Sequence, residues 1–158
     1  MPTTAQRISA ILISAVLLAG GAFAASLVPS AEAEQKTGTR KALEITFEGV
    51  RNSDGHVIVF VFDDADAYNT SDYGAAVGYR EVPASTGTLS VSFPRLTSGP
   101  YAAVAFHDEN GNRDLDMNGT IPREGYAVTG AKDAFDEPAF ERAASDERSR
   151  RLRVHYLN

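Results

Sequence analysis

An acidic segment that runs from His107 to Asp116 carries the side chains best suited to chemistry. Oxygen-bearing side chains recur there at every second position, namely Asp108, Asn110, Asn112, Asp114 and Asp116. Calcium takes about six to eight oxygen ligands, and a loop of alternating Asp and Asn can wrap around such an ion. The spacing therefore predicts a calcium site made by these five side chains, with calcium as the cofactor.

The D-x-N-x-N-x-x-x-D spacing is similar to the opening of an EF-hand-type loop, but two positions depart from that pattern. Arg113 occupies the sixth position, where such loops have glycine, and Gly119 occupies the twelfth, where they have a bidentate glutamate. Asp116 or Glu124 would have to complete the ligand set. Two interpretations therefore stay open: a calcium loop, or a metal-free turn in which Asp and Asn side chains bond to their own backbone.

Catalytic motifs are absent from the sequence. It has no cysteine and no G-x-S-x-G, H-E-x-x-H, P-loop or G-x-G-x-x-G pattern. The three histidines are far apart in the chain and lack the spacing of a zinc site. We therefore expect a non-enzymatic protein. The alternative is a periplasmic hydrolase that uses His107 with Asp108, Asp116 or Glu124.

Alternating strands are expected to position the acidic loop. Residues 43–48, 88–93 and 151–156 alternate apolar with polar side chains, which predicts strands with one buried face. Residues 57–62 and 101–106 are almost wholly apolar, so we expect strands covered on both sides, the second leading directly into the loop. With a turn at Asn52–Gly55 and one short helical turn near Pro138–Ala143, the pattern predicts an all-β fold, an antiparallel β-sandwich of about seven strands.

Three further segments carry weaker expectations. Residues 65–78 are rich in Asp, Asn, Ser, Tyr and Gly without a period, which predicts a long surface loop. Four arginines, at positions 148, 150, 151 and 153, are interpreted as a solvated face of the last strand. Pro122 and residues 124–126 are interpreted as turn and packing residues.

The N-terminus has the order of a secretory signal peptide. Arg7 precedes an apolar run, and the small residues Ala31 and Ala33 fit the positions before a cut after residue 33. We expect a signal peptide over 1–33, a flexible lead-in over 34–41 and a single domain over 42–158. The product would be exported, periplasmic or secreted, with no stable membrane anchor after cleavage.

The formal net charge of −6 argues against nucleic acid as a partner, because its phosphates would be repelled. A protein or carbohydrate partner of unknown identity is the expectation. The sequence does not decide the oligomeric state.

The segments Gly99–Asn112, Leu115–Asp116, Ile121–Tyr126 and Glu137–Glu141 together resemble a bacterial exported family, the domain of unknown function 2141. The resemblance extends from about residue 43 to 157 and implies a transthyretin-like or carboxypeptidase-regulatory-like β-sandwich, without an activity. Arg113 and Ala127 stand where the family pattern usually has glycine.

Overall fold

Seven strands form two sheets in the computed structural model, which describes residues 41–96 and 99–157. The first sheet has the strand order β4-β1-β9 and the second has the order β3-β2-β5-β8, while β6 and β7 form a small ribbon of their own. The strands are β1 (Leu43–Val50), β2 (His56–Phe62), β3 (Gly78–Pro83), β4 (Gly87–Phe93), β5 (Ala102–Asp108), β6 (Met117–Asn118), β7 (Ile121–Pro122), β8 (Gly125–Val128) and β9 (Ser149–Arg153).

The predicted all-β sandwich is confirmed, with one exception to the expected strand pairing. All neighbouring strands in the described part are antiparallel except β1 and β9, which run parallel, so that Glu44 lies opposite Ser149. The described strands belong to one compact unit that spans Thr37–Asn158. The predicted signal peptide (1–33) and residues 34–40 of the predicted lead-in lie outside the described residues.

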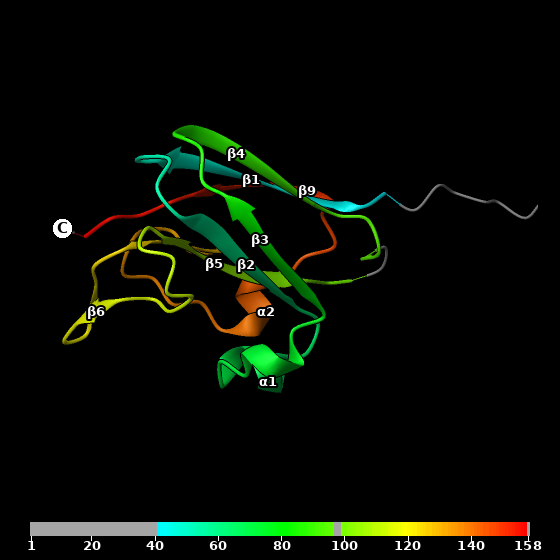
Figure 1. Ribbon diagram of the computed structural model, residues 1–158. Helices are drawn as coiled ribbons and strands as arrows, with labels where there is room; N and C mark the ends of the chain where they lie inside the picture. Colours follow the sequence, from blue (N-terminus) through cyan, green and yellow to red (C-terminus); the bar gives the residue numbers. More distant parts are fainter. Residues whose placement is uncertain (1–40, 97–98, 158) are drawn as a thin grey trace, which may run out of the picture. The chain divides into compact units, whose positions relative to one another are not determined.

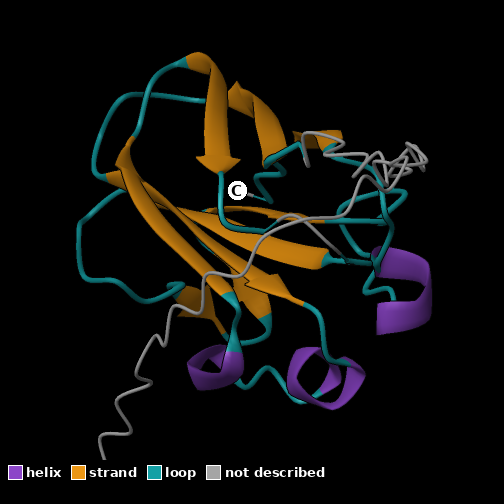
Figure 2. Ribbon diagram, turned by 90° about the vertical axis from the view of Figure 1, so that its right-hand side faces the viewer, coloured by secondary structure: helices purple, strands orange, loops and turns teal. Residues whose placement is uncertain are grey.

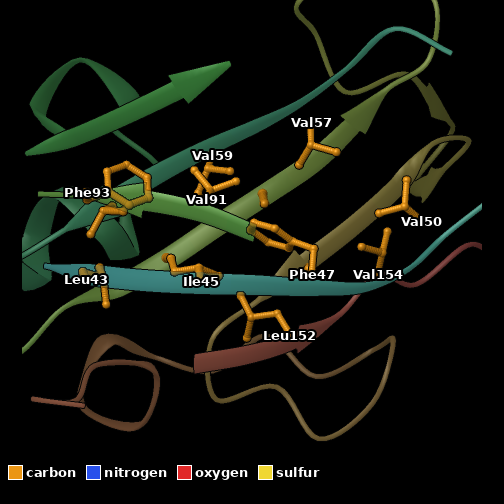
Figure 3. Packing of buried hydrophobic residues seen from close by; sticks show 14 of the residues in the cluster. Leu43, Ile45, Phe47, Val50, Val57, Val59, Val91, Phe93, Leu152 and Val154 are labelled. Atoms are coloured by element: carbon orange, nitrogen blue, oxygen red, sulfur yellow. The ribbon is translucent and has the colours of Figure 1, made fainter. Parts of the chain in front are cut away.

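The core is made by the inward side chains of both sheets, as the alternation predicted for β1 and β4 and the apolar runs predicted for β2 and β5 indicate. Leu43, Ile45 and Phe47 of β1 are buried and pack with Val57 and Val59 of β2 (Figure 3). Each fully buried side chain of this size contributes roughly 1.5–3 kcal/mol through removal of apolar surface from water. This core covers the inner face of the second sheet. The outer face of that sheet is therefore available for a site.

Strand β5 directs successive side chains to opposite faces of the second sheet. Ala103 and Ala105 belong to the core, whereas Val104 and Phe106 are half-buried on the outer face. The same alternation sends His107 inward and starts the acidic loop from the outer face at the end of the strand.

Residues 65–78 are not the surface loop that the sequence predicted. They contain helix α1 (Ala65–Asn69) and a 3-10 helix, η1 (Tyr73–Ala75), and β3 begins at Gly78. Each short helix is capped by an aspartate, since Asp64 accepts the backbone N–H of Ala67 at 2.8 Å and the Asp72 side chain accepts that of Gly74. The predicted helical turn near the C-terminus is confirmed as α2 (Phe140–Ala143).

Figure 1 shows α1 and the β6 segment below β2 and β5, away from β4 and β1. In Figure 2 the helices lie at the periphery of the sheets and not between them. None of the helices in the described ranges is long and apolar enough to cross a membrane.

Two interpretations of polar segments need correction. Gly125 and Tyr126 are packing residues, as expected, but they lie in strand β8, which pairs with β5, and not in a turn. Arg150 is not solvated: it is buried on the same face of β9 as Leu152, and its guanidinium donates to the backbone carbonyls of Ala143, Ser145 and Glu147. The arginines at 151 and 153 are exposed, as predicted.

Candidate functional site

Asp108 organises the acidic loop from its first position. It is fully buried, and its carboxylate accepts hydrogen bonds from the backbone N–H groups of Gly111 (2.8 Å), Asn112 (3.1 Å) and Arg113 (2.9 Å). Hydrogen bonds to an ionised acceptor are about twice as strong as neutral ones. The carboxylate of Asp108 therefore holds the turn together from inside.

The next residues of the predicted metal set continue this self-bonded pattern. The side-chain oxygen of Asn110 accepts the N–H of Asn112 at 2.9 Å, and that of Asn112 accepts the N–H of Asp114 at 2.8 Å. The amide nitrogens of Asn110 and Asn112 both donate to the carboxylate of Asp116, at 2.7 and 3.1 Å. Four of the five predicted ligands are thus brought together, whereas Asp114 lines a cleft described below.

Glu124 closes the loop from the far side. It is buried, and its carboxylate accepts the backbone N–H groups of Glu109 (2.9 Å) and Asp116 (3.2 Å). Within residues 41–96 and 99–157, no group of three or more His, Cys, Asp or Glu side chains is arranged to hold a metal ion. The calcium site stays a prediction, for a loop whose oxygens are engaged with its own N–H groups.

His107 lies on the inner side of β5 and has a partner at each ring nitrogen. Nδ1 is 2.8 Å from the hydroxyl of Tyr156, and Nε2 is 2.8 Å from the backbone carbonyl oxygen of Asp54, to which it donates. With the neutral ring in this tautomer, Nδ1 accepts from Tyr156. His107 therefore connects the β1–β2 turn to the C-terminal segment, while the carboxylate of Asp108 bonds to its own loop. The hydrolase alternative stays a prediction.

A cleft over the outer face of the second sheet is the other candidate site. Its floor is laid by cross-strand neighbours: Phe60 lies opposite Val104, Val104 opposite Val128, and Phe106 opposite Tyr126. The cleft has a volume of about 780 Å³. Pockets that take small molecules are typically about 300–1,000 Å³ and are lined mainly by apolar and aromatic groups.

Three segments form the walls of this cleft. They are residues 113–122, which include the β6–β7 ribbon, residues 68–73 from α1 and η1, and residues 134–139 before α2. Four of the six exposed large apolar side chains of the described residues line it, namely Tyr73 (47% exposed), Met117 (48%), Ile121 (49%) and Phe135 (80%). Exposed apolar groups that gather at one concave place mark an interaction site.

Two tyrosine hydroxyls fasten the wall formed by residues 134–139. Tyr68 donates to the backbone carbonyl of Pro138 at 3.1 Å, and Tyr126 donates to that of Ala134. Burial raises the pKa of Tyr68 to about 12, so its hydroxyl remains a donor at neutral pH. This wall is therefore tied to the sheet and to α1.

Comparison with known proteins supplies a family. A family model described as "Uncharacterized protein conserved in bacteria (DUF2141)" matches residues 45–152, more than half of the 158-residue chain. The chain belongs to this family. No curated protein and no solved structure matches it. Because membership in DUF2141 carries no activity, the function of this member rests on its site geometry.

The backbone at position 113 suits the glycine that the resemblance implies there. Arg113 has a φ of 64°, in the left-handed region that favours glycine. Its N–H bonds to Asp108 and its guanidinium pairs with Glu81 at 3.1 Å, which hold it there. Ala127, the other departure from the pattern, is buried in β8 and packs in the core.

Sequence reasoning singled out the acidic loop and missed the cleft. The available signal was the placement of aromatic residues at 60, 106 and 126, which alternation directs to one face. To use that signal, one must know that β8 is a strand and how its residues are aligned with those of β5. Neither follows from four residues of sequence.

Proposed function

We propose that this DUF2141 protein is a non-enzymatic binding module that takes a small ligand into the cleft over the outer face of the β3-β2-β5-β8 sheet. The observation that carries the proposal is the aromatic floor of a cleft of about 780 Å³ whose rim gathers exposed apolar side chains. Burial of those side chains by a ligand releases water from apolar surface, which favours binding by about 25 cal/mol per Å² before the costs of association.

The floor is suited to recognition because it is rigid. Phe60 and Phe106 sit in central strands, each hydrogen-bonded on both sides, and the ring of Phe60 packs 4.6 Å from that of Tyr73 and 5.3 Å from that of Tyr79, between centroids. Aromatic side chains fixed in this way bury large areas at a small cost in side-chain entropy. A ligand therefore meets a preformed surface.

The residues of the hydrolase alternative are engaged away from the cleft. His107 faces the core and bonds to Tyr156 and Asp54, and Asp108 and Glu124 bond to backbone N–H groups. Among the described residues, none of these three side chains lines the cleft. A hydrolase that used these residues would need one of them directed at its substrate.

Ligand-observed and protein-observed NMR of the purified protein tests the proposal. A panel of aromatic fragments that bear amine, alcohol, carboxylate or sugar groups should perturb backbone signals of β5, β8 and residues 113–122. The variants Phe135→Ser and Ile121→Ser should weaken the fragments that bind, since both remove apolar rim surface without touching the core.

Val77→Ser is the matched control. Val77 is also an exposed apolar residue (41%), but it does not line the cleft. It should leave binding unchanged. Loss of binding in all three variants, or changes in NMR signals confined to another face of the protein, would contradict the proposal.

We also infer that the protein acts outside the cytoplasm, because its first 33 residues have the order of a signal peptide. N-terminal sequencing of the product from a bacterial host checks this inference. It should begin at Glu34, and a product that retains Arg7 would contradict the cleavage.

A further inference from the structure

Two carboxylates at the walls of the cleft differ from every other charged group that lines it. Asp114 lies on the wall formed by residues 113–122 and Glu137 on the wall formed by residues 134–139. Both residues are exposed. Within the described ranges, neither carboxylate has a hydrogen bond or an ion pair.

The remaining charges that line the cleft are already paired. Arg113 is paired with Glu81, and Asp136 is paired with Arg142. The uncompensated charge of the lining is therefore negative and comes from Asp114 and Glu137. The negative charge of Glu137 also reaches the floor, because it adds to the effect of burial in raising the pKa of Tyr126.

Three aromatic side chains lie in the floor between these walls, beside Val104 and Val128. Phe60, Phe106 and Tyr126 lie there, with Tyr73 and Phe135 at the rim. The face of an aromatic ring attracts a cation placed within about 6 Å of its centre, and a nearby carboxylate adds to that attraction. A neutral or anionic ligand would gain neither contribution, and an anion would be repelled.

Resting on the proposed function, we propose that the ligand of the cleft is a small organic cation, an ammonium group attached to an apolar or aromatic body. The body lies on the aromatic floor, and the ammonium group is directed to the wall that carries Asp114 or Glu137. The acidic net charge of −6 of the whole chain favours the approach of such a ligand.

The test uses three probes that share one apolar body: 2-phenylethylamine, 2-phenylethanol and 3-phenylpropionate. Their affinities for the purified protein are measured by NMR titration at pH 7 and low salt. The amine should bind roughly tenfold more tightly than the alcohol, which corresponds to about 1.4 kcal/mol of charge-dependent attraction, and the propionate should bind most weakly. Added salt at about 0.5 M should reduce the preference of the cleft for the amine.

Asp114→Asn and Glu137→Gln remove the charges while keeping the shapes. Each should reduce the affinity of the amine by roughly threefold and leave that of the alcohol unchanged. Glu141→Gln, an exposed residue of α2 that does not line the cleft, is the matched control and should change nothing.

Other outcomes overturn the inference in distinguishable ways. Equal affinity for amine and alcohol, or tighter binding of a neutral sugar, with both weakened by Ile121→Ser, keeps the binding cleft and rejects the cation. No binding of any probe or of the fragment panel rejects the cleft and the cation together.

Discussion

The acidic loop contributes Arg113, Asp114 and Leu115 to the lining of the cleft, but the loop and the cleft use polar residues in opposite ways. In the loop, the carboxylate oxygens of Asp108 and Asp116 accept hydrogen bonds from N–H groups of the loop itself, and those of Glu124 accept from its backbone. At the cleft, Asp114 and Glu137 have no such partners among the described residues, and apolar side chains beside them stay exposed. Polar groups that satisfy one another build structure, whereas groups left unsatisfied at a concave surface are available to a ligand.

Replacement of Asp108 by alanine should produce the largest loss of stability and so test the structural role of the loop carboxylates. Three backbone N–H groups would lose an ionised, buried acceptor, so the free energy of unfolding should fall by about 3 kcal/mol or more. Asp114→Ala in the same loop removes an exposed carboxylate and should stay within about 0.5 kcal/mol. Urea denaturation of both variants measures the difference, and equal losses would show that the two aspartates are equivalent.

Calcium binding would remove the difference between the loop and the cleft, because the loop would then be a ligand site as well. The calcium hypothesis predicts that calcium at one hundred times its dissociation constant raises the free energy of unfolding by about 2.7 kcal/mol. Asp116→Ala should abolish this gain, and magnesium should not reproduce it. An unfolding midpoint that is the same with calcium and with chelator would leave the loop as a metal-free turn.

Substitutions of Arg113 sharpen the account of the loop by separating backbone strain from charge. Glycine should relieve a left-handed backbone that costs other residues about 1 kcal/mol, while alanine keeps that cost. Both variants lose the exposed pair with Glu81. Arg113→Gly should therefore be more stable than Arg113→Ala by about 1 kcal/mol in thermal or urea unfolding. If alanine proved equal to glycine, the strain would be absent.

The smallest expected effect is the pH dependence of the pair that ties the start of the loop to the β1–β2 turn. The hydrogen bond from Arg51 lowers the pKa of Glu109 below its ordinary value of 4.5. Because the folded pKa is the lower one, the pair stabilises the fold above about pH 4.5, and that contribution is lost as the pH falls through the folded pKa.

Glu109→Gln should flatten the acid side of the stability profile by less than about 1 kcal/mol. Glu141→Gln is the control and should retain the profile of the unmodified protein. Identical acid profiles for Glu109→Gln and the unmodified protein would contradict a role for this pair.

The strands of the core could be predicted because burial on one face imposes a period of two. β1 and β4 were expected from this pattern, β9 from its final residues, and β2 and β5 from their almost wholly apolar runs. β3 and β8 were missed because Pro83 and Gly125 are poor strand residues, tolerated here at strand ends. Helix α1 was missed because a helix of five residues is too short to show a helical period of apolar residues, and its start is marked by the Asp64 cap.

The loop and the cleft also differed in how far they could be predicted from the sequence. The residues of the loop are contiguous, so their spacing was visible in the sequence, although their partners were not. The cleft is assembled from strands β2, β5 and β8, from α1 and η1, and from the segments 113–122 and 134–139. Its residues are separated widely in the chain, and only the sheet register brings Phe60, Phe106 and Tyr126 to one surface.

The parallel pairing of β1 with β9 has a consequence for how the chain matures. β9 covers one edge of β1, and its residues are synthesised last among the strands, so Glu44 must wait for Ser149 before that edge is closed. A chain still emerging from the ribosome therefore keeps an open strand edge, at which a strand of another molecule can pair. Closing so long a loop is entropically costly and slows folding. The first sheet therefore stays incomplete until the last strand has been synthesised and has paired with β1.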